Sequence, residues 1–552
     1  MSSSSDFSDA TTAPTPDTSP STPQKSTFSL APLSRHSAPE TVKTYAESLL
    51  SLTDNLTSAA TSSLYSLSHF QPLIAGARLA IISMMSQSIT YGRLRILTAD
   101  QGVYAFPPPG KESKGSEEQA EIRVIRDTFW LRLVTLGDLG FAEAYMAGDC
   151  EVSDLVRVFK IFVRSRPALT SSNITGVTTI PSRLFSLITS LTNSRFANTI
   201  SNSLSNIQAH YDLSNGMFSS FLSADMTYSC AIFPELDKDL RERTELAETE
   251  GVNGGIGLKR IGADGGFGGK QVGETTKIGN GEDELDELEE AQLAKLRHII
   301  RKADIRPGHR VLEIGSGWGS LAIEAVRMTS CTVDTITLSA QQKVLAEERV
   351  KRAGLAGRIR VWLVDYRKLP DSWKGSFDRV VSIEMLEAVG KEFTQGYFSV
   401  IDQMLNEGGV ACIQVITIPE SRFDKYQQEV DFIRKWIFPG GFLPTVTYVV
   451  DAIQKGANNK LVVDSISNIG PHYARTLREW RRRFITNFSA RIVPALLAEH
   501  PNMTEEDIEV FKRKWIYYFC YCEVGFSERV LGDHIFTMAR EGNADYGCTT
   551  FG

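Results

Sequence analysis

From Arg310 onward, short aliphatic runs alternate with stretches of helical periodicity. Five runs have the length and the β-branched content of buried strands, namely Arg310–Ile314, Thr332–Thr337, Ile359–Val364, Phe377–Ile383 and Val410–Ile416. Alternation of this kind is typical of a doubly wound parallel sheet with helices on both faces. We therefore predict an α/β, Rossmann-like domain for this part of the chain.

The patterns before Arg310 are less regular. In chain order they predict a disordered Ser/Thr/Pro-rich tail (1–40), a helical segment (41–90), a smaller α+β accessory domain (91–165), a linker (166–205) and one large catalytic domain (206–552). The helical segment either covers the accessory domain or lies on a membrane surface. Its most apolar part, 71–85, is interrupted by Arg78 and is too short to cross a bilayer.

An acidic, glycine-rich insertion at about 236–282 interrupts the large domain. It has 12 glycines between Gly251 and Gly281, so it cannot build a core. Residues 235–290 carry a net charge of −9, and because the whole chain carries −7, the remainder is close to neutral at +2. We expect no nucleic-acid partner, while a local contact with anionic lipid remains open.

The seven cysteines lack the spacing of a metal site, so no metal is expected. A reduced, cytoplasmic chain is the preferred interpretation, because no signal peptide precedes the first domain.

Three glycines at alternate positions follow the first predicted strand and open a helix. Gly315, Gly317 and Gly319 allow the backbone to approach a nucleotide closely. S-adenosylmethionine fits this loop better than NAD, whose fingerprint needs a glycine where Ser320 stands and an acid after the second strand.

Polar residues collect where the predicted strands end, at the edge where parallel sheets bind ligands. Thr337 and Gln342 are expected to reach the ribose hydroxyls, and Asp365, with Tyr366 beside it, the adenine amino group. The candidate cofactor-binding residues are Tyr228, Ser229, Glu313, Gly315, Gly317, Gly319, Thr337, Gln342, Asp365 and Tyr366.

Several motifs in a fixed order resemble the cyclopropane-fatty-acyl-phospholipid synthases, including the mycolic acid cyclopropane synthases. They include His210–Phe218, Thr227–Phe233, Ser382–Gly390, Gln414–Glu420 and Trp515–Cys520. The resemblance covers about 205–540 and, more loosely, 92–165. The sequence Glu-Met-Leu-Glu-Ala-Val-Gly at 384–390 most resembles the corresponding motif of plant and fungal members.

The resemblance implies methylene transfer from S-adenosylmethionine to a cis double bond of a phospholipid acyl chain. The resulting carbocation loses a proton to a bound bicarbonate, and a cyclopropane ring closes. Carried over by position, the bicarbonate pocket involves Cys230, Glu387, Gln414, Ile416 and Tyr518, with the backbone at Glu384. Cys230 could alternatively be a nucleophile, but no activating histidine is evident.

The sequence departs from the bacterial pattern at three positions. Gln414 and Ala388 stand where those members have histidine, so the pocket should titrate differently. Glu384 stands where they have glycine, and it adds a carboxylate that points either toward Glu387 or to solvent.

A basic run of Arg475, Arg478, Arg481, Arg482 and Arg483 is either a solvated helix face or a site for phospholipid headgroups. We expect a peripheral membrane enzyme acting on unsaturated phospholipid, which could form a homodimer. The alternatives are a lipid C-methyltransferase that does not close the ring, acting on a fatty acid or sphingolipid, and a non-catalytic lipid-binding protein.

Overall fold

The computed structural model describes residues 71–171, 214–241 and 286–547. The predicted tail (1–40) and most of the linker and of the insertion lie outside these residues, as does the first part of the helical segment (41–70). Among the helices within the described ranges, none has both the length and the apolar character needed to cross a membrane.

The first described part contains a four-stranded sheet with helices packed against it. Its elements are α2 (Gln71–Ser88), β1 (Tyr91–Leu97), β2 (Val103–Phe106), β3 (Lys114–Val124), α3 (Thr128–Leu136), α4 (Asp138–Met146), β4 (Cys150–Val152) and α5 (Leu155–Ser171). The strand order is β2-β1-β3-β4, and β1 pairs with β3 in parallel. Strand β1 alternates between buried and exposed side chains, as a half-buried strand does.

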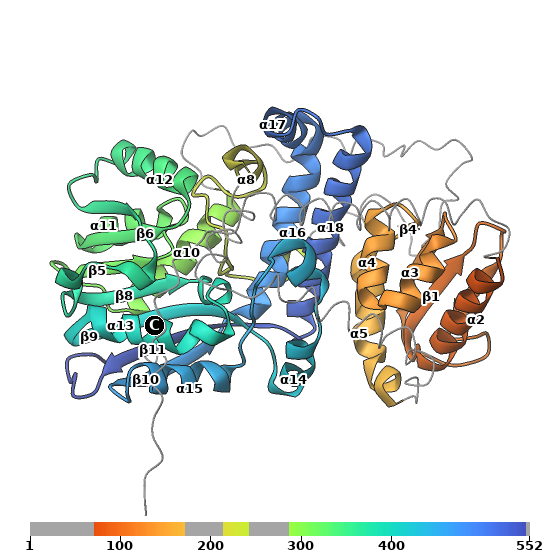
Figure 1. Cartoon of the computed structure of the whole chain (residues 1–552), viewed down its shortest axis with the longest axis horizontal. Coiled ribbons are helices and arrows are strands. Elements are labelled where there is room, and N and C mark those ends of the chain that lie inside the picture. The colour runs from red at the N-terminus through yellow and green to blue at the C-terminus, as the bar shows by residue number, and fades with distance from the viewer. Residues whose placement is uncertain (1–70, 172–213, 242–285, 548–552) are drawn as a thin grey trace, which may run out of the picture. The chain divides into compact units, whose positions relative to one another are not determined.

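The second part contains a seven-stranded sheet in the order β10-β11-β9-β8-β5-β6-β7 (Figure 1). Its strands are β5 (Arg310–Ile314), β6 (Thr332–Thr337), β7 (Ile359–Leu363), β8 (Phe377–Ile383), β9 (Leu405–Thr417), β10 (Leu461–Asn468) and β11 (Gly532–Arg540). The pairs joining β5 through β9 are parallel, whereas β11 is antiparallel to both β9 and β10. The doubly wound prediction is confirmed for five strands, and two antiparallel strands extend the sheet at one edge.

Helices cover both faces of this sheet. One face packs against α10 (Glu287–Lys302), α11 (Ser320–Thr329) and α12 (Ala340–Arg352), and the other against α13 (Thr394–Met404) and α15 (Val446–Gly456). Strand β5 shows the division, because Val311 packs into the first core and Leu312 and Ile314 into the second. Alternate side chains of one buried strand therefore serve both layers.

Two long helices, α16 (Gly470–Asn487) and α18 (Glu505–Ser527), pack against each other beside the sheet (Figure 1). Aromatic side chains fill their contact, with Phe484 and Trp515 stacked at 6.2 Å between ring centroids. Short helices complete this part: α8 (Asn215–Phe221), α14 (Glu420–Gln428) and α17 (Val493–Glu499). Residues of α8 and α16 border the site described next.

Candidate functional site

The glycine loop lies between β5 and α11 and has left-handed backbone at all three predicted glycines. The φ angles are 97° at Gly315, 47° at Gly317 and 87° at Gly319. A Cβ atom at Gly315 would lie 3.1 Å from Cγ of Met385, so this position also lacks room for a side chain. The loop therefore presents its backbone, and the first turn of α11, to a ligand.

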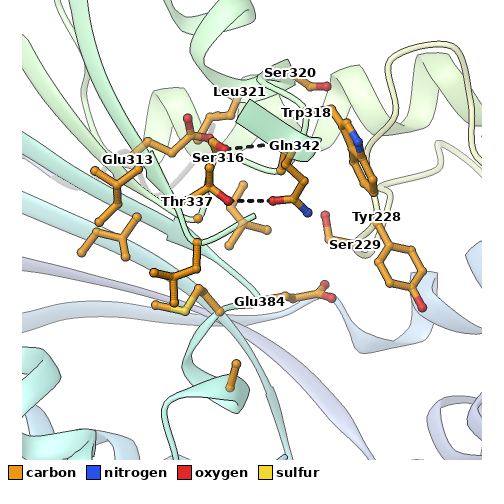
Figure 2. Close-up of a pocket in the computed structure, with 18 of the residues that line it drawn as sticks. Tyr228, Ser229, Glu313, Ser316, Trp318, Ser320, Leu321, Thr337, Gln342 and Glu384 are labelled. Carbon is orange, nitrogen blue, oxygen red and sulfur yellow. Dashed lines mark hydrogen bonds between the residues drawn. The ribbon is translucent and has the colours of Figure 1, made fainter. Parts of the chain in front are cut away.

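A cleft opens beside this loop at the ends of the parallel strands (Figure 2). Nine of the ten predicted cofactor-binding residues line it: Tyr228, Ser229, Glu313, Gly315, Gly317, Thr337, Gln342, Asp365 and Tyr366. Gly319 is the exception, because it begins α11 and a Cβ there would face Ala346 instead. The cleft is also lined by Lys295, Trp318 and Arg367, which the sequence analysis did not select.

The polar groups at the strand ends are already ordered by hydrogen bonds. The Thr337 hydroxyl donates to Oε1 of Gln342 at 2.9 Å. Nε of Arg367 donates to Oδ1 of Asp365, also at 2.9 Å. Although burial opposes it, this hydrogen bonding keeps the pKa of Asp365 below its ordinary value. Asp365 is therefore a fixed anionic acceptor in the cleft.

Glu313 and Lys295 are two fully buried ionisable groups in the same cleft. Burial raises the pKa of Glu313 to about 8, and its Oε2 has no hydrogen-bond partner among the described residues. Burial lowers the pKa of Lys295, whose Nζ donates to Oγ of Ser229 at 2.5 Å. An unpartnered carboxyl oxygen beside a glycine loop fits the cationic methionine part of S-adenosylmethionine, so the residues present fit this cofactor.

Glu384 points inward, which answers the question that its sequence position left open. Its Oε1 accepts hydrogen bonds from the backbone N–H of Cys230 and from Nε2 of Gln414, both at 2.8 Å. Its Oε2 accepts a hydrogen bond from the Tyr473 hydroxyl at 2.5 Å. The carboxylate lies in the wall of the cleft, on the side of Tyr228 and Ser229 (Figure 2). Burial raises its pKa from the ordinary value.

Glu387 lies beside Glu384, in a single helical turn (Leu386–Ala388) after β8. Its Oε1 accepts a hydrogen bond from the backbone N–H of Ile416 at 2.6 Å. Its Oε2 is buried without a partner among the described residues. Burial, together with the charge of Glu384, raises the pKa of Glu387 to about 8. This carboxyl is therefore neutral near pH 7.

Tyr518 connects this cluster of acids to the cofactor cleft. Its hydroxyl lies 3.2 Å from the hydroxyl of Tyr228, which lines the cleft. The six predicted catalytic residues, Cys230, Glu384, Glu387, Gln414, Ile416 and Tyr518, thus come together from distant parts of the chain. Cys230 is buried and its pKa is raised well above the ordinary value by burial, so the thiol is not activated as a nucleophile.

Three buried members of the site were missed from the sequence: Lys295, Tyr473 and Asp533. Oδ2 of Asp533 accepts a hydrogen bond from Nε2 of Gln414 at 2.8 Å, and burial with the charge of Glu384 raises the pKa of Asp533 well above its ordinary value. A signal was present for Lys295, which lies seven residues after Leu288 on the apolar face of α10. Asp533 gave no such signal, because its strand β11 also contains His534, Thr537 and Arg540.

The backbone and amide donors expected to hold bicarbonate are engaged within the chain itself, most of them by carboxyl groups. The single N–H of Cys230 and one of the two Nε2 hydrogens of Gln414 go to Glu384, and the other goes to Asp533. The N–H of Ile416 goes to Glu387. The backbone N–H of Glu384 donates to the carbonyl oxygen of Gln414. A separate bicarbonate ion therefore does not fit the expected position.

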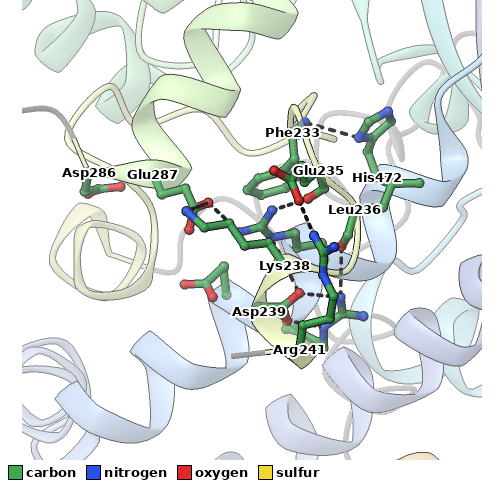
Figure 3. A network of polar contacts seen from close by, with 12 residues as sticks. Phe233, Glu235, Leu236, Lys238, Asp239, Arg241, Asp286, Glu287 and His472 are labelled. Atoms are coloured by element: carbon green, nitrogen blue, oxygen red, sulfur yellow. Dashed lines mark hydrogen bonds and ion pairs between the residues drawn. The ribbon is translucent and has the colours of Figure 1, made fainter. Parts of the chain in front are cut away.

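The basic run on α16 is neutralised within the chain. The ion pairs are Arg475 with Glu287, Arg478 with Asp239, Arg481 with Glu523, Arg482 with Glu479 and Arg483 with Asp286, at N–O distances of 2.7 to 2.8 Å. Figure 3 shows three of the acidic partners, Asp239, Asp286 and Glu287. Arg475 and Arg478 are buried. The ion pairs of Arg475, Arg478 and Arg483 hold residues 235–239 and the start of α10 against α16. The run is therefore a set of structural contacts.

Comparison with known proteins agrees with the resemblance seen in the motifs. A family model described as mycolic acid cyclopropane synthetase matches residues 198–253 and 281–536. The tuberculostearic acid methyltransferase UfaA1 of Mycobacterium tuberculosis is 30% identical over 473 residues, covering 85% of this chain and 93% of that protein. The cyclopropane-fatty-acyl-phospholipid synthase of Escherichia coli is 30% identical over 413 residues, covering 74% of this chain and 85% of that protein.

Among solved structures, the cyclopropane synthase MmaA2 from Mycobacterium tuberculosis aligns with 61% of this chain and 98% of that chain, at 25% identity and a TM-score of 0.45. The family assignment does not depend on this alignment, because the sequence matches cover most of the chain. The predicted family and methyltransferase class are confirmed by those matches. The chain belongs to the mycolic acid cyclopropane synthetase family.

Proposed function

We propose that the chain transfers a one-carbon unit from S-adenosylmethionine to a cis double bond in a phospholipid acyl chain, and closes it into a cyclopropane ring. The observation that carries the proposal is the buried cluster of Glu384, Glu387 and Tyr518 against the wall of the cofactor cleft. A cluster of carboxyl groups in the wall of the cleft would supply what this reaction needs, because its intermediate is cationic.

S-adenosylmethionine, when bound, supplies an electrophilic methyl carbon. An alkene is a weak nucleophile, so the chain has to hold it in line with that carbon and exclude water. Tyr228 lines the cleft at this point and packs against two further aromatic rings: the centroids of Tyr228 and Trp480 are 5.0 Å apart, and those of Phe218 and Tyr228 are 5.2 Å apart. Such rings keep the region dry and present electron-rich faces to a cation.

A second product is favoured by one of the relatives. UfaA1 is named for tuberculostearic acid, and 30% identity over 85% of this chain is as close as the match to the cyclopropane synthase. Ring formation and methyl branching share the first transfer and differ in what happens to the cation.

In this proposal the protein reaches its lipid at the membrane surface as a peripheral protein.

The test is an assay with purified protein, vesicles of cis-monounsaturated phospholipid, and S-adenosylmethionine carrying a trideuterated methyl group. Mass spectrometry of the released fatty acids counts the deuterons retained: two in a ring, three in a methyl branch formed without proton loss. Proton NMR separates a ring from an exocyclic methylene group by the upfield resonance of cyclopropane. Unlabelled lipid, in a protein that binds the cofactor in calorimetry, would contradict the proposed reaction. Failure to bind the cofactor at all would favour a non-catalytic lipid-binding protein.

A further inference from the structure

Glu384 lies where the resemblance implied a bound anion. We infer that the Glu384 carboxylate is the general base of this enzyme and takes the place of bicarbonate, so that turnover needs no added anion. The inference rests on the proposed function, because it names the group that removes the proton in that reaction. It concerns this chain's own residues and adds no ligand to the site.

The hydrogen bonds of Glu384 are those of an anion held in a pocket. Three donors from separate segments, the N–H of Cys230, Nε2 of Gln414 and the hydroxyl of Tyr473, converge on its two oxygens. Neither neighbouring acid gathers three donors from separate segments. Glu387 accepts hydrogen bonds from the N–H of Ile416 and from its own backbone N–H, and Asp533 accepts one from Nε2 of Gln414. Donors favour the ionised form of the acid that they contact, so Glu384 is the member of the cluster that carries the negative charge.

The buried charges around Glu384 agree with this assignment. Lys295 is a buried amine on the cleft side, and it interacts electrostatically with Glu384, although burial lowers its pKa. Burial and the charge of Glu384 raise the pKa of both nearby carboxyl groups, to about 8 for Glu387 and well above the ordinary value for Asp533. Both neighbours are therefore harder to ionise when Glu384 carries the charge. Burial also raises the pKa of Glu384, which makes its carboxylate a stronger base than an exposed glutamate.

The backbone conformation at Glu384 is energetically unfavourable for a residue with a side chain. Its φ angle is 47°, in the left-handed region that glycine adopts freely and that residues with a Cβ disfavour. The same residue also has its carboxylate buried. Strain and buried charge at one residue of a cleft mark a position that is retained for function.

The two oxygens of Glu384 accept hydrogen bonds from different groups. Oε1 accepts those of Cys230 and Gln414, and Oε2 accepts that of Tyr473. The carboxyl group of Asp533 also forms a side-chain hydrogen bond with Glu384. In the step that we assign to it, a C–H bond of the transferred carbon breaks and its electron pair forms the third C–C bond of the ring at the cationic carbon. The proton goes to Oε2 of Glu384, which returns it to solvent before the next turnover.

The experiment compares the wild-type protein with Glu384→Gly in the deuterium assay, using buffer freed of carbon dioxide, with and without added bicarbonate or formate. We expect bicarbonate to leave wild-type turnover unchanged within about twofold. We expect Glu384→Gly to lose at least ~100-fold in turnover without an anion, and to recover part of it when a small carboxylate enters the space left behind. Asn459→Gly is the matched control, because Asn459 is exposed and has a φ angle of 59°, and it should behave like wild type.

Glu384→Gln keeps the volume of the side chain, so its lost turnover should not be rescued by formate. Thermal unfolding and cofactor calorimetry show whether Glu384→Gly folds. If it does not fold, Glu384→Gln and the anion dependence of the wild-type protein test whether Glu384 is the base. Wild-type activity that disappears without bicarbonate and returns with it would overturn the inference, as would full activity of Glu384→Gly without any anion. Either result leaves the proposed function intact, whereas wild-type protein that labels no lipid under any anion condition contradicts the proposed function itself.

Discussion

Nε2 of Gln414 donates a hydrogen bond to Oδ2 of Asp533 at 2.8 Å, across the antiparallel pair of β9 and β11. The same nitrogen donates to Oε1 of Glu384, also at 2.8 Å. One uncharged amide therefore connects two buried acids, Glu384 and Asp533, from distant parts of the catalytic domain. A histidine at this position would offer one donor on that side of its ring and would titrate near neutral pH.

Replacing Gln414 by methionine keeps the length of the side chain and removes both donors. We expect a loss of about 3 kcal/mol in the free energy of unfolding, because two buried carboxyl groups lose a hydrogen-bond donor. Denaturant unfolding measures this loss. Gln403→Met is the control, since Gln403 is exposed and its Nε2 bonds Ser399 on the same helix, and it should change stability by less than about 0.5 kcal/mol. Equal stability of the two variants would show that the amide does not hold the acids.

Gly315 and Gly308 both have left-handed backbone, but only Gly315 borders the cleft. Their φ angles are 97° and 84°, and a Cβ at Gly308 would meet nothing within 4 Å. Alanine at either position should therefore cost about 1 kcal/mol of stability. Only Gly315→Ala should also weaken S-adenosylmethionine binding, by at least ~10-fold, because its Cβ displaces Met385 and enters the loop. Titration calorimetry measures both affinities, and an equal effect of the two variants would remove the loop from cofactor binding.

Much of the fold could be predicted because the central strands are aliphatic runs bounded by turn residues. The runs at 310–314, 332–337 and 377–383 match β5, β6 and β8 residue for residue. Strand β9 begins at Leu405, five residues before its predicted start, because its first five residues include two glycines and two polar side chains. The antiparallel strands β10 and β11 were not predicted, since β10 alternates at the edge of the sheet and β11 pairs only with distant segments.

Site residues could be predicted where their position along a strand determines which edge of the sheet their side chains reach. Thr337 and Asp365 end strands, so they reach the ligand edge of the sheet. The direction of Glu384 depends on a φ angle of 47° that no sequence pattern signals. The roles of Lys295 and Asp533 depend on buried partners far away in the chain, Ser229 and Gln414. These pairings arise only when the segments pack together.

Arg478 should be a structural residue rather than a contact for lipid headgroups. Its Nε and Nη2 both bond the carboxylate of Asp239, at 2.7 and 2.9 Å, and its side chain is only 8% exposed. Arg478→Ala leaves a buried carboxylate without its main partner, so we expect a loss of about 3–5 kcal/mol in unfolding free energy. Arg482→Ala is the control, because the Arg482 side chain is 50% exposed. At temperatures where both variants are folded, co-sedimentation with anionic vesicles should be unchanged in Arg478→Ala, and weaker binding there would restore a role in headgroup recognition.

Glu313 should release a proton when the cofactor binds. In the free protein, burial raises the pKa of Glu313 to about 8, so the folded state holds a proton here between about pH 4.5 and 8 that the unfolded chain does not. Stability of the free protein should therefore fall as pH rises through this window. A cationic ligand beside the unpartnered Oε2 favours the ionised form and lowers the pKa.

Binding of S-adenosylmethionine at pH 7 should then release between about half and one proton per cofactor. Calorimetry in buffers of different ionisation enthalpy measures this number. Glu313→Gln should remove most of the release, because an amide has no proton to lose in this range. Glu324→Gln serves as the control, since Glu324 is buried on the neighbouring helix, pairs with Arg297 at 2.7 Å and is not among the residues that line the cleft. The same proton release in wild type and Glu313→Gln would show that the cofactor's positive charge is not placed against Glu313.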